Sequence, residues 1–235
     1  MLLPDVRAIY QRDPAAQSWL EVLLCYPGVQ ALWLHRLAHW LYCFNVPFLP
    51  RLISQVNRFF TGIEIHPGAQ IGRGVFIDHG IGVVIGETAI VGDYATIYQD
   101  VTLGGTGKET GKRHPTLGKN VVVGAGAKVL GNIHIGENVR IGAASVVLRD
   151  VPSDCTVVGI PGRISLQKSD ALDALGHNNL RDIEAEVIQA LFKRVKALEE
   201  KLEQLEPQSS PRSLGQVEAA QSNAMIEEFL NGAGI

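Results

Sequence analysis

An otherwise aliphatic and repetitive sequence is interrupted twice by polar residues that could do chemistry, first at Asp78-His79-Gly80. A neutral imidazole accepts a proton near physiological pH, so His79 is predicted to act as a general base. A base of this kind needs a partner that orients its ring, and Glu64, fifteen residues earlier, is the candidate. The competing interpretations are a structural histidine and a surface carboxylate.

The second interruption begins with a glycine-rich run at residues 104–108 and ends in Lys112-Arg113-His114. The guanidinium of Arg113 suits bidentate capture of a carboxylate, and His114 could donate a hydrogen bond to a substrate or act as a second base. A solvated charged loop is the alternative, but loops on rigid scaffolds often carry function. The glycine-rich run lacks the spacing of a phosphate-binding loop and is weak evidence by itself.

A metal site has to be weighed as well, because neighbouring repeats could bring several histidines together. The histidines of the repetitive region are His66, His79, His114 and His134. They include no His-x4-His pair and have no cysteine close by, and two of them adjoin charged residues that suit substrate contacts. We therefore expect no metal.

The scaffold that must position these residues is a six-residue repeat of large aliphatic side chains, many of them followed directly by glycine. A period of six fits neither an amphipathic helix nor an alternating hairpin. It is typical of a solenoid of short strands, three to a coil, with the aliphatic side chains stacked inside. The repeat positions are Ile65, Ile71, Ile77, Ile85, Val91, Ile97, Leu103, Leu117, Val123, Val129, Ile135, Ile141 and Val147. Both interruptions are expected to form loops outside the coils.

The flanking segments have helical patterns. Residues 5–60 predict short helices, with starts at Asp13-Pro14, Pro27-Gly28 and Pro47, that pack on each other and on the first coils. The apolar set of the third helix is Leu49, Leu52, Ile53, Val56, Phe59 and Phe60. We expect a helical segment over residues 1–61, the solenoid over 62–165, a C-terminal helix within 166–206 and a flexible tail over 207–235.

The C-terminal helix, predicted over residues 180–206, carries an apolar seam whose members alternate steps of three and four. The seam consists of Ile188, Leu191, Val195, Leu198, Leu202 and Leu205. Two interpretations are open: a single helix lying on the flank of the solenoid, or a coiled coil formed between copies of the chain.

Composition excludes several classes of protein. The chain has 235 residues, a formal net charge of −3 and no basic cluster, which argues against nucleic-acid binding. It lacks an uncharged apolar run of about eighteen residues, so no membrane span is expected, and no signal peptide is evident. Cys25, Cys43 and Cys155 are few and widely spaced, as in a cytoplasmic protein with reduced thiols.

Several short motifs together resemble the hexapeptide-repeat acyltransferases and, within them, the serine O-acetyltransferases. They are Arg12-Asp13-Pro14-Ala15, Ile65-His66-Pro67-Gly68-Ala69, Asp78-His79-Gly80, Gly86-Glu87-Thr88-Ala89, residues 101–108, Arg113-His114-Pro115 and Gly124-Ala125-Gly126-Ala127-Lys128. The resemblance covers roughly residues 5–165. It implies a left-handed parallel β-helix with helical ends and transfer of acetyl from acetyl-CoA to the hydroxyl of L-serine, the step before sulfide incorporation into cysteine.

The resemblance also implies a role for individual residues. His79 would take the hydroxyl proton, Glu64 would orient it although the family usually has aspartate there, and His114 would assist at the reacting centre. Asp13 and Asp78 would bind the serine ammonium and Arg113 its carboxylate. The coenzyme A slot would be lined by Gly105, Ala125, Lys128 and Ala143.

Family members form trimers with active sites between subunits, and we expect a homotrimer rather than a hexamer because the helical lead-in is short. The last residues, ending in Ile235, are similar to family tails that insert into O-acetylserine sulfhydrylase (cysteine synthase). An acetyltransferase of the same repeat family acting on a sugar or another small hydroxyl compound is the alternative. A scaffold that carries the tail to a partner enzyme is a third interpretation.

Overall fold

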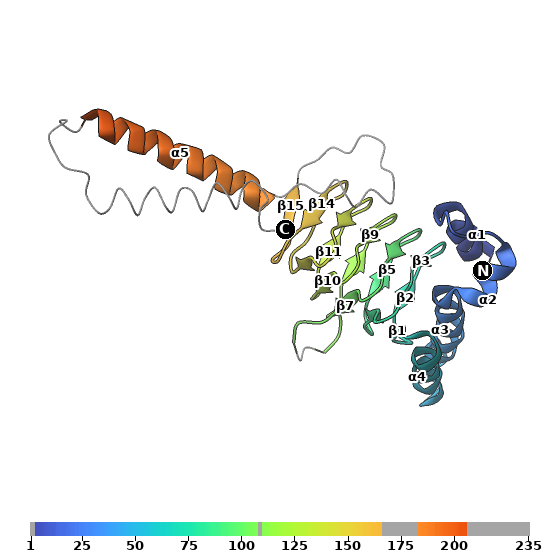
Figure 1. Cartoon of the computed structure of the whole chain (residues 1–235). Helices are drawn as coiled ribbons and strands as arrows, with labels where there is room; N and C mark the ends of the chain where they lie inside the picture. The colour runs from blue at the N-terminus through green and yellow to red at the C-terminus, as the bar shows by residue number, and fades with distance from the viewer. Residues whose placement is uncertain (1–2, 108–109, 166–182, 206–235) are drawn as a thin grey trace. The chain divides into compact units, whose positions relative to one another are not determined.

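The structure, a computed structural model, describes residues 3–107, 110–165 and 183–205. The chain divides into two compact units, Met1–Leu180 and Arg181–Ile235, which are described separately. The first unit holds four helices and a stack of short strands, and Figure 1 shows the helices at the end of the stack where the first strands lie.

Four helices precede the strands, and their ends follow local sequence signals. They are α1 (Leu3–Arg12), α2 (Trp19–Cys25), α3 (Pro27–Cys43) and α4 (Leu49–Thr61). The hydroxyl of Ser18 caps α2 by accepting the amide of Glu21, and Gly62, with φ of 71°, closes α4 in the left-handed conformation. Asp13-Pro14 does not start a helix as predicted: it lies between α1 and α2, where Asp13 accepts the amide of Ala15.

Helix α4 packs on the rest of the protein through its polar side. Ser54 donates to the carbonyl of Ile65 at 2.6 Å, and the amide of Asn57 donates to the carbonyl of Ala31 at 3.0 Å. Both polar side chains are buried, whereas the ring of Phe59 is 83% exposed. The prediction that the apolar set of this helix packs on the coils is therefore wrong for most of its members. The exposed ones are Leu49, Leu52, Val56, Phe59 and Phe60.

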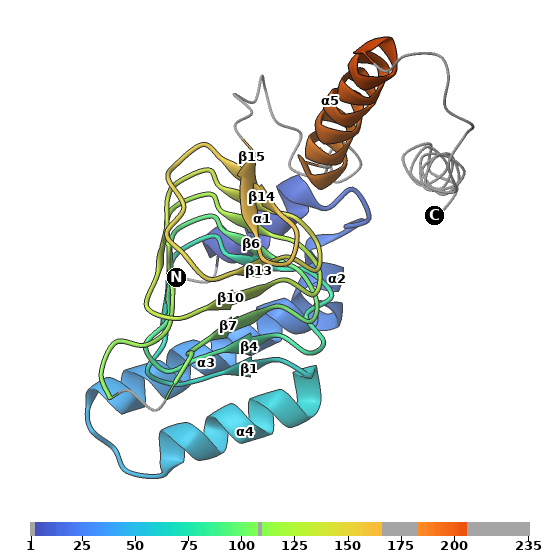
Figure 2. The same ribbon diagram turned by 90° about the vertical axis from the view of Figure 1, so that its left-hand side faces the viewer.

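The strands form a parallel β-helix of three sheets, visible as stacked coils in Figure 2. Sheet A contains β1 (Glu64–Ile65), β4 (Val84–Ile85), β7 (Thr102–Gly104), β10 (Lys128–Leu130) and β13 (Val146–Val147). Sheet B contains β2 (Gln70–Ile71), β5 (Ile90–Val91), β8 (Thr116–Leu117) and β11 (His134–Ile135). Sheet C contains β3 (Phe76–Ile77), β6 (Thr96–Ile97), β9 (Val122–Val123), β12 (Arg140–Ile141), β14 (Thr156–Val158) and β15 (Arg163–Ser165).

The six-residue repeat forms the core of the β-helix. All the predicted repeat positions are buried except Ile71, which is partly buried against the same cluster. They stack in register between coils, as Ile65 pairs with Ile85 and Ile85 with Leu103. The glycines after them allow the coils to approach, since a Cβ on Gly92 would lie 2.4 Å from the carbonyl oxygen of Gly118.

Both interruptions of the repeat lie at corners where the chain passes from one sheet to the next. Residues 78–83 connect β3 of sheet C to β4 of sheet A, and we call this edge of the stack the C–A corner. Residues 105–115 connect β7 of sheet A to β8 of sheet B, and we call this edge the A–B corner. The two groups of candidate residues thus lie on different edges of the β-helix.

The second unit contains one described helix, α5 (Ile183–Leu205). Five members of its apolar seam are exposed to solvent, namely Ile188, Leu191, Val195, Leu198 and Leu202. Among the described helices, none combines the length and the apolar character needed to cross a membrane.

Candidate functional site

His79 stands at the C–A corner with its side chain 75% exposed. Its backbone is left-handed, with φ of 57°, and the following Gly80 packs so tightly on the core that a Cβ there would lie 2.4 Å from Cδ1 of Ile63. Its Nε2 lies 3.9 Å from Oδ1 of Asp78. The corner therefore presents an accessible imidazole with a carboxylate beside it, which is what a general base requires.

Asp78 lies beside this imidazole and is influenced by the charge of Asp13. Burial raises the pKa of Asp78, the charge of His79 opposes the rise, and the charge of Asp13 adds to it. Asp13 accepts a hydrogen bond from the hydroxyl of Tyr26 at 2.6 Å, and burial together with this bond raises the pKa of that phenol. A cation bound between Asp13 and Asp78 would stabilise the ionised form of both carboxylates.

Glu64 forms an ion pair with Arg58. Its Oε2 lies 3.0 Å from Nη1 of Arg58, the last-turn arginine of α4. The predicted pairing of Glu64 with His79 therefore stays a prediction, and it would require the carboxylate to turn away from Arg58.

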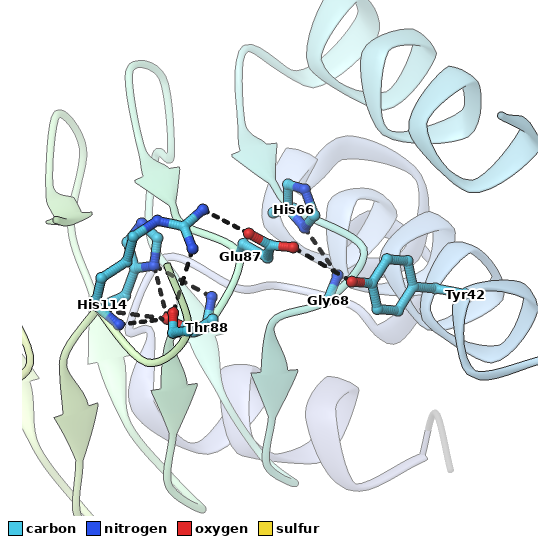
Figure 3. A network of polar contacts seen from close by, with 8 residues as sticks. Tyr42, His66, Gly68, Glu87, Thr88 and His114 are labelled. Carbon is cyan, nitrogen blue, oxygen red and sulfur yellow. Dashed lines mark hydrogen bonds and ion pairs between the residues drawn. The ribbon is translucent and has the colours of Figure 1, made fainter. Parts of the chain in front are cut away.

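Arg113 stands at the A–B corner and is held by a carboxylate of the coil before it. Nη2 of Arg113 and Oε2 of Glu87 are 2.5 Å apart, and the bond keeps the pKa of Glu87 low. The hydroxyl of Tyr42 on α3 donates to the other oxygen of Glu87 at 3.3 Å, as Figure 3 shows. The guanidinium is thus fixed in direction before any substrate arrives.

Thr88 orients His114, as Glu87 orients Arg113. The Thr88 amide donates to Nδ1 of His114 at 3.2 Å, and the Thr88 hydroxyl lies 2.9 Å from the same nitrogen (Figure 3). Because Nδ1 accepts the amide, the neutral ring carries its proton on Nε2. Burial and the charge of Arg113 lower the pKa of His114, which favours this neutral form. His114 can therefore donate a hydrogen bond from Nε2 at neutral pH.

Sequence reasoning assigned no role to Glu87, Thr88 or Tyr42. A signal for the first two was present in the strand register, in which Ile90 pairs with Thr116. That offset of twenty-six residues places Glu87 under Arg113 and Thr88 under His114, as their bonds confirm. The repeat positions give the same offset when they are grouped three to a coil, because Leu117 then stacks on Val91 across the long interruption.

The residues expected to line a coenzyme A slot divide between the two corners. Ala125 and Ala143 lie on successive coils of the C–A corner, partly and fully exposed, where the amide of Ala144 donates to the carbonyl of Ala125. Lys128 at the start of β10 reaches back to Asp100 of the same corner. Gly105 lies instead at the A–B corner, where a Cβ would lie 3.3 Å from the carbonyl oxygen of Arg113.

The part of the chain that the structure describes contains no group of three or more histidine, cysteine or acidic residues close enough to share a metal ion. The four histidines weighed as ligands lie apart or make other contacts. His66, for example, accepts the amide of Gly68 through Nδ1 at 3.0 Å.

A parallel β-helix with a histidine at one corner and an Arg-His pair at another defines a transferase of the hexapeptide-repeat class, and residues 114–149 match the family described as "Bacterial transferase hexapeptide (six repeats)". Serine acetyltransferase of Synechococcus elongatus is 62% identical over 240 residues, which span all of this chain and 98% of the relative. The chain belongs to the serine acetyltransferase family. The resemblance and the left-handed β-helical fold expected from the sequence are confirmed.

Solved structures of the same family are similar to this chain. Serine acetyltransferase of Neisseria gonorrhoeae in complex with serine is 43% identical with a TM-score of 0.68, over 70% of this chain and 67% of that one. Serine acetyltransferase of Brucella abortus in complex with coenzyme A is 45% identical with a TM-score of 0.68, over 69% of this chain and 65% of that one.

Proposed function

We propose that this chain transfers the acetyl group of acetyl-CoA to the hydroxyl of L-serine, giving O-acetyl-L-serine for cysteine biosynthesis in the cytoplasm. One observation carries the proposal: each corner holds half of a site for an amino acid with a reactive hydroxyl. The C–A corner supplies an exposed imidazole and the carboxylate of Asp78, the segment between α1 and α2 adds that of Asp13, and the A–B corner supplies an oriented guanidinium. The family relatives solved with serine and with coenzyme A support both substrates.

The acyl transfer can be written with the groups of the two corners. His79 accepts the proton of the serine hydroxyl while the hydroxyl oxygen bonds to the carbonyl carbon of the thioester. The carbon–sulfur bond then breaks, and the departing thiolate takes the proton back from His79. His114, with its proton on Nε2, would donate a hydrogen bond near the reacting centre. Glu64 would orient His79.

Serine recognition follows from charge. The ammonium group would lie between Asp13 and Asp78, whose mutual influence a cation relieves. The carboxylate would bind Arg113 through two parallel hydrogen bonds, in a direction set by Glu87. Gly105, Ala125, Lys128 and Ala143 would line the slot for coenzyme A. A sugar hydroxyl offers neither charge, so these anchors favour an amino acid.

We also propose a homotrimer in which the A–B corner of one subunit meets the C–A corner of the next. Within the described residues of one chain, Arg113 and His114 contact Glu87 and Thr88 of the preceding coil, whereas His79 lies beside Asp78. Because the two halves lie on different edges of the β-helix, a neighbouring subunit would complete the site. A three-fold ring of such contacts closes on itself.

The test of both proposals is a mixing experiment read by thiol release from acetyl-CoA. At a serine concentration far below the raised KM of Arg113→Ala, chains carrying His79→Ala and chains carrying Arg113→Ala should each show little activity alone. When they are co-expressed with different tags, they should together recover about a quarter of the unmutated activity if subunits assort at random. Absence of recovery would mean that the site lies within one chain. A panel of amino-acid and sugar acceptors, assayed with the unmutated protein, tests the substrate: a sugar used better than serine would overturn it.

The partner proposal concerns residues outside the described part of the chain. We propose that the segment containing Ile235 binds O-acetylserine sulfhydrylase, because an apolar side chain next to a carboxylate suits a pocket built for an amino acid. Removing Ile235 should abolish binding while acetyl transfer persists. The measurement is a titration of the sulfhydrylase with both forms, and equal affinities would refute the contact.

A further inference from the structure

We propose that α5 forms a parallel, in-register coiled coil with the same helix of another copy of the chain, a proposal that does not depend on the enzymatic function. The starting observation is that the apolar seam of this helix is uncovered. Its members Ile188, Leu191, Val195, Leu198 and Leu202 are between 39% and 61% exposed. They lie on a helix of 23 residues that belongs to a unit of its own.

An uncovered seam of this kind needs a partner. Helices in proteins owe most of their stability to packing of an apolar face, and a seam open to water supplies little of it. The alternating steps of three and four give a period of 3.5 residues, which is the period that keeps a seam in contact with an identical, supercoiled helix. An identical helix is therefore the occupant whose shape the spacing fits.

The charges beside the seam indicate the direction of the partner. With Ile188 and Val195 at position a of the heptad, Arg194 and Lys201 occupy position g, and Glu199 occupies position e. In a parallel pair, a residue at g faces the residue at e five positions later on the partner, so Arg194 faces Glu199 in both directions.

An antiparallel pair would bring the g positions together. Arg194 would then face a second Arg194 or Lys201, and like charges at such positions repel. The pattern therefore favours the parallel arrangement over the antiparallel one.

Disulfide cross-linking in the full-length protein tests the arrangement. In a background with Cys25→Ser and Cys43→Ser, which removes the exposed thiols, Val195→Cys places a thiol on the seam and Lys193→Cys places one on the opposite side. A parallel in-register coil brings the two residues 195 together, so Val195→Cys should give disulfide-linked dimers under mild oxidation and Lys193→Cys should not. Equal cross-linking of the two variants, or none, would refute the proposal.

Charge exchange in the same protein tests the pairing without disturbing the seam. Arg194→Glu alone and Glu199→Arg alone each place like charges opposite one another and should reduce the Val195→Cys cross-link several-fold. The double exchange restores opposite charges and should restore the cross-link. If the double variant is no better than the single ones, or if cross-linking persists in all of them, the Arg194–Glu199 pairing is wrong.

Discussion

The imidazole of His114 rests on the backbone of Gly86. A Cβ added at residue 86 would lie 2.0 Å from Cδ2 and 2.1 Å from Nε2 of the ring. Distances this short cannot be relieved by a small adjustment, because Thr88 holds the other side of the ring through Nδ1. The ring of His114 is therefore held in place by two contacts. It packs against the backbone of Gly86, where no side chain is present, and its Nδ1 contacts the amide and the hydroxyl of Thr88.

Gly86→Ala should consequently displace His114. A misplacement of about 1 Å at a reacting centre costs roughly a hundredfold in rate, so a loss of this order in kcat/KM for serine is expected. Gly107→Ala is the matched comparison for stability, since a Cβ there meets nothing within 4 Å and should leave the melting temperature unchanged. Full activity in Gly86→Ala would show that the position of His114 is unimportant to the reaction.

His79→Ala should lower turnover by about two to four orders of magnitude, the range expected for loss of a general base. Binding of coenzyme A, measured by calorimetry, should change little because the imidazole acts on the acceptor. Glu64→Gln should cost less, since a side chain that only orients the base can be replaced in part. Unchanged turnover in His79→Ala would remove this residue from the mechanism.

Arg113→Ala should raise the KM for serine strongly, because a charge-assisted pair of hydrogen bonds to the substrate carboxylate is lost. Serine amide provides the control: it should be a poor substrate of the unmutated protein and should no longer be at a disadvantage in the variant. If the unmutated protein uses serine and its amide equally well, Arg113 does not bind the carboxylate.

His35 should make the fold sensitive to acid. Burial, with smaller contributions from His39 and Arg36, lowers the pKa of this imidazole to about 3 from an ordinary 6.5. Below about pH 6.5 the imidazole of His35 is protonated in the unfolded chain but stays neutral in the folded chain. The free energy of unfolding is therefore highest above that pH and decreases as the pH falls toward 3.

The measurement is urea unfolding between pH 4 and 8, with His35→Gln as the variant that cannot titrate. The unmutated protein should lose stability relative to the variant on acidification below pH 6.5. Parallel curves for the two proteins would show that His35 does not take up a proton on unfolding.

The core was predictable because a six-residue period determines which side chains stack, whatever the handedness of the coil. The predicted roles of His79, Arg113 and His114 rested on residue chemistry, and the structure adds what orients two of them. Glu87 and Thr88 were missed because their partners lie across the long insertion, although the repeat positions, grouped three to a coil, give the strand offset that joins them. The pairing of Glu64 with Arg58 depends on where α4 ends relative to β1, which no local pattern determines.

Helix α4 shows a second limit of pattern reasoning. Its periodicity correctly identifies an amphipathic helix, but periodicity does not say which side faces the protein. Here hydrogen bonds from Ser54 and Asn57 to the carbonyl groups of Ile65 and Ala31 turn the polar side of the helix toward the protein, so the apolar side faces solvent. Acceptors on neighbouring elements exist only once the fold is formed.

The last strand, β15, runs antiparallel to β14, with Val157 opposite Ile164, whereas the named strands before it pair in parallel. A further coil would have to continue sheet C in the parallel direction, and the edge that it would use is already occupied. At the other end of the stack, α3 lies on β3 so closely that a Cβ on Gly28 would touch the carbonyl of Ile77. Within the described residues, sheet C is thus closed at both ends, by β15 at one and by α3 at the other, so neither of its edges is open for a further parallel strand to add on and start a fibre.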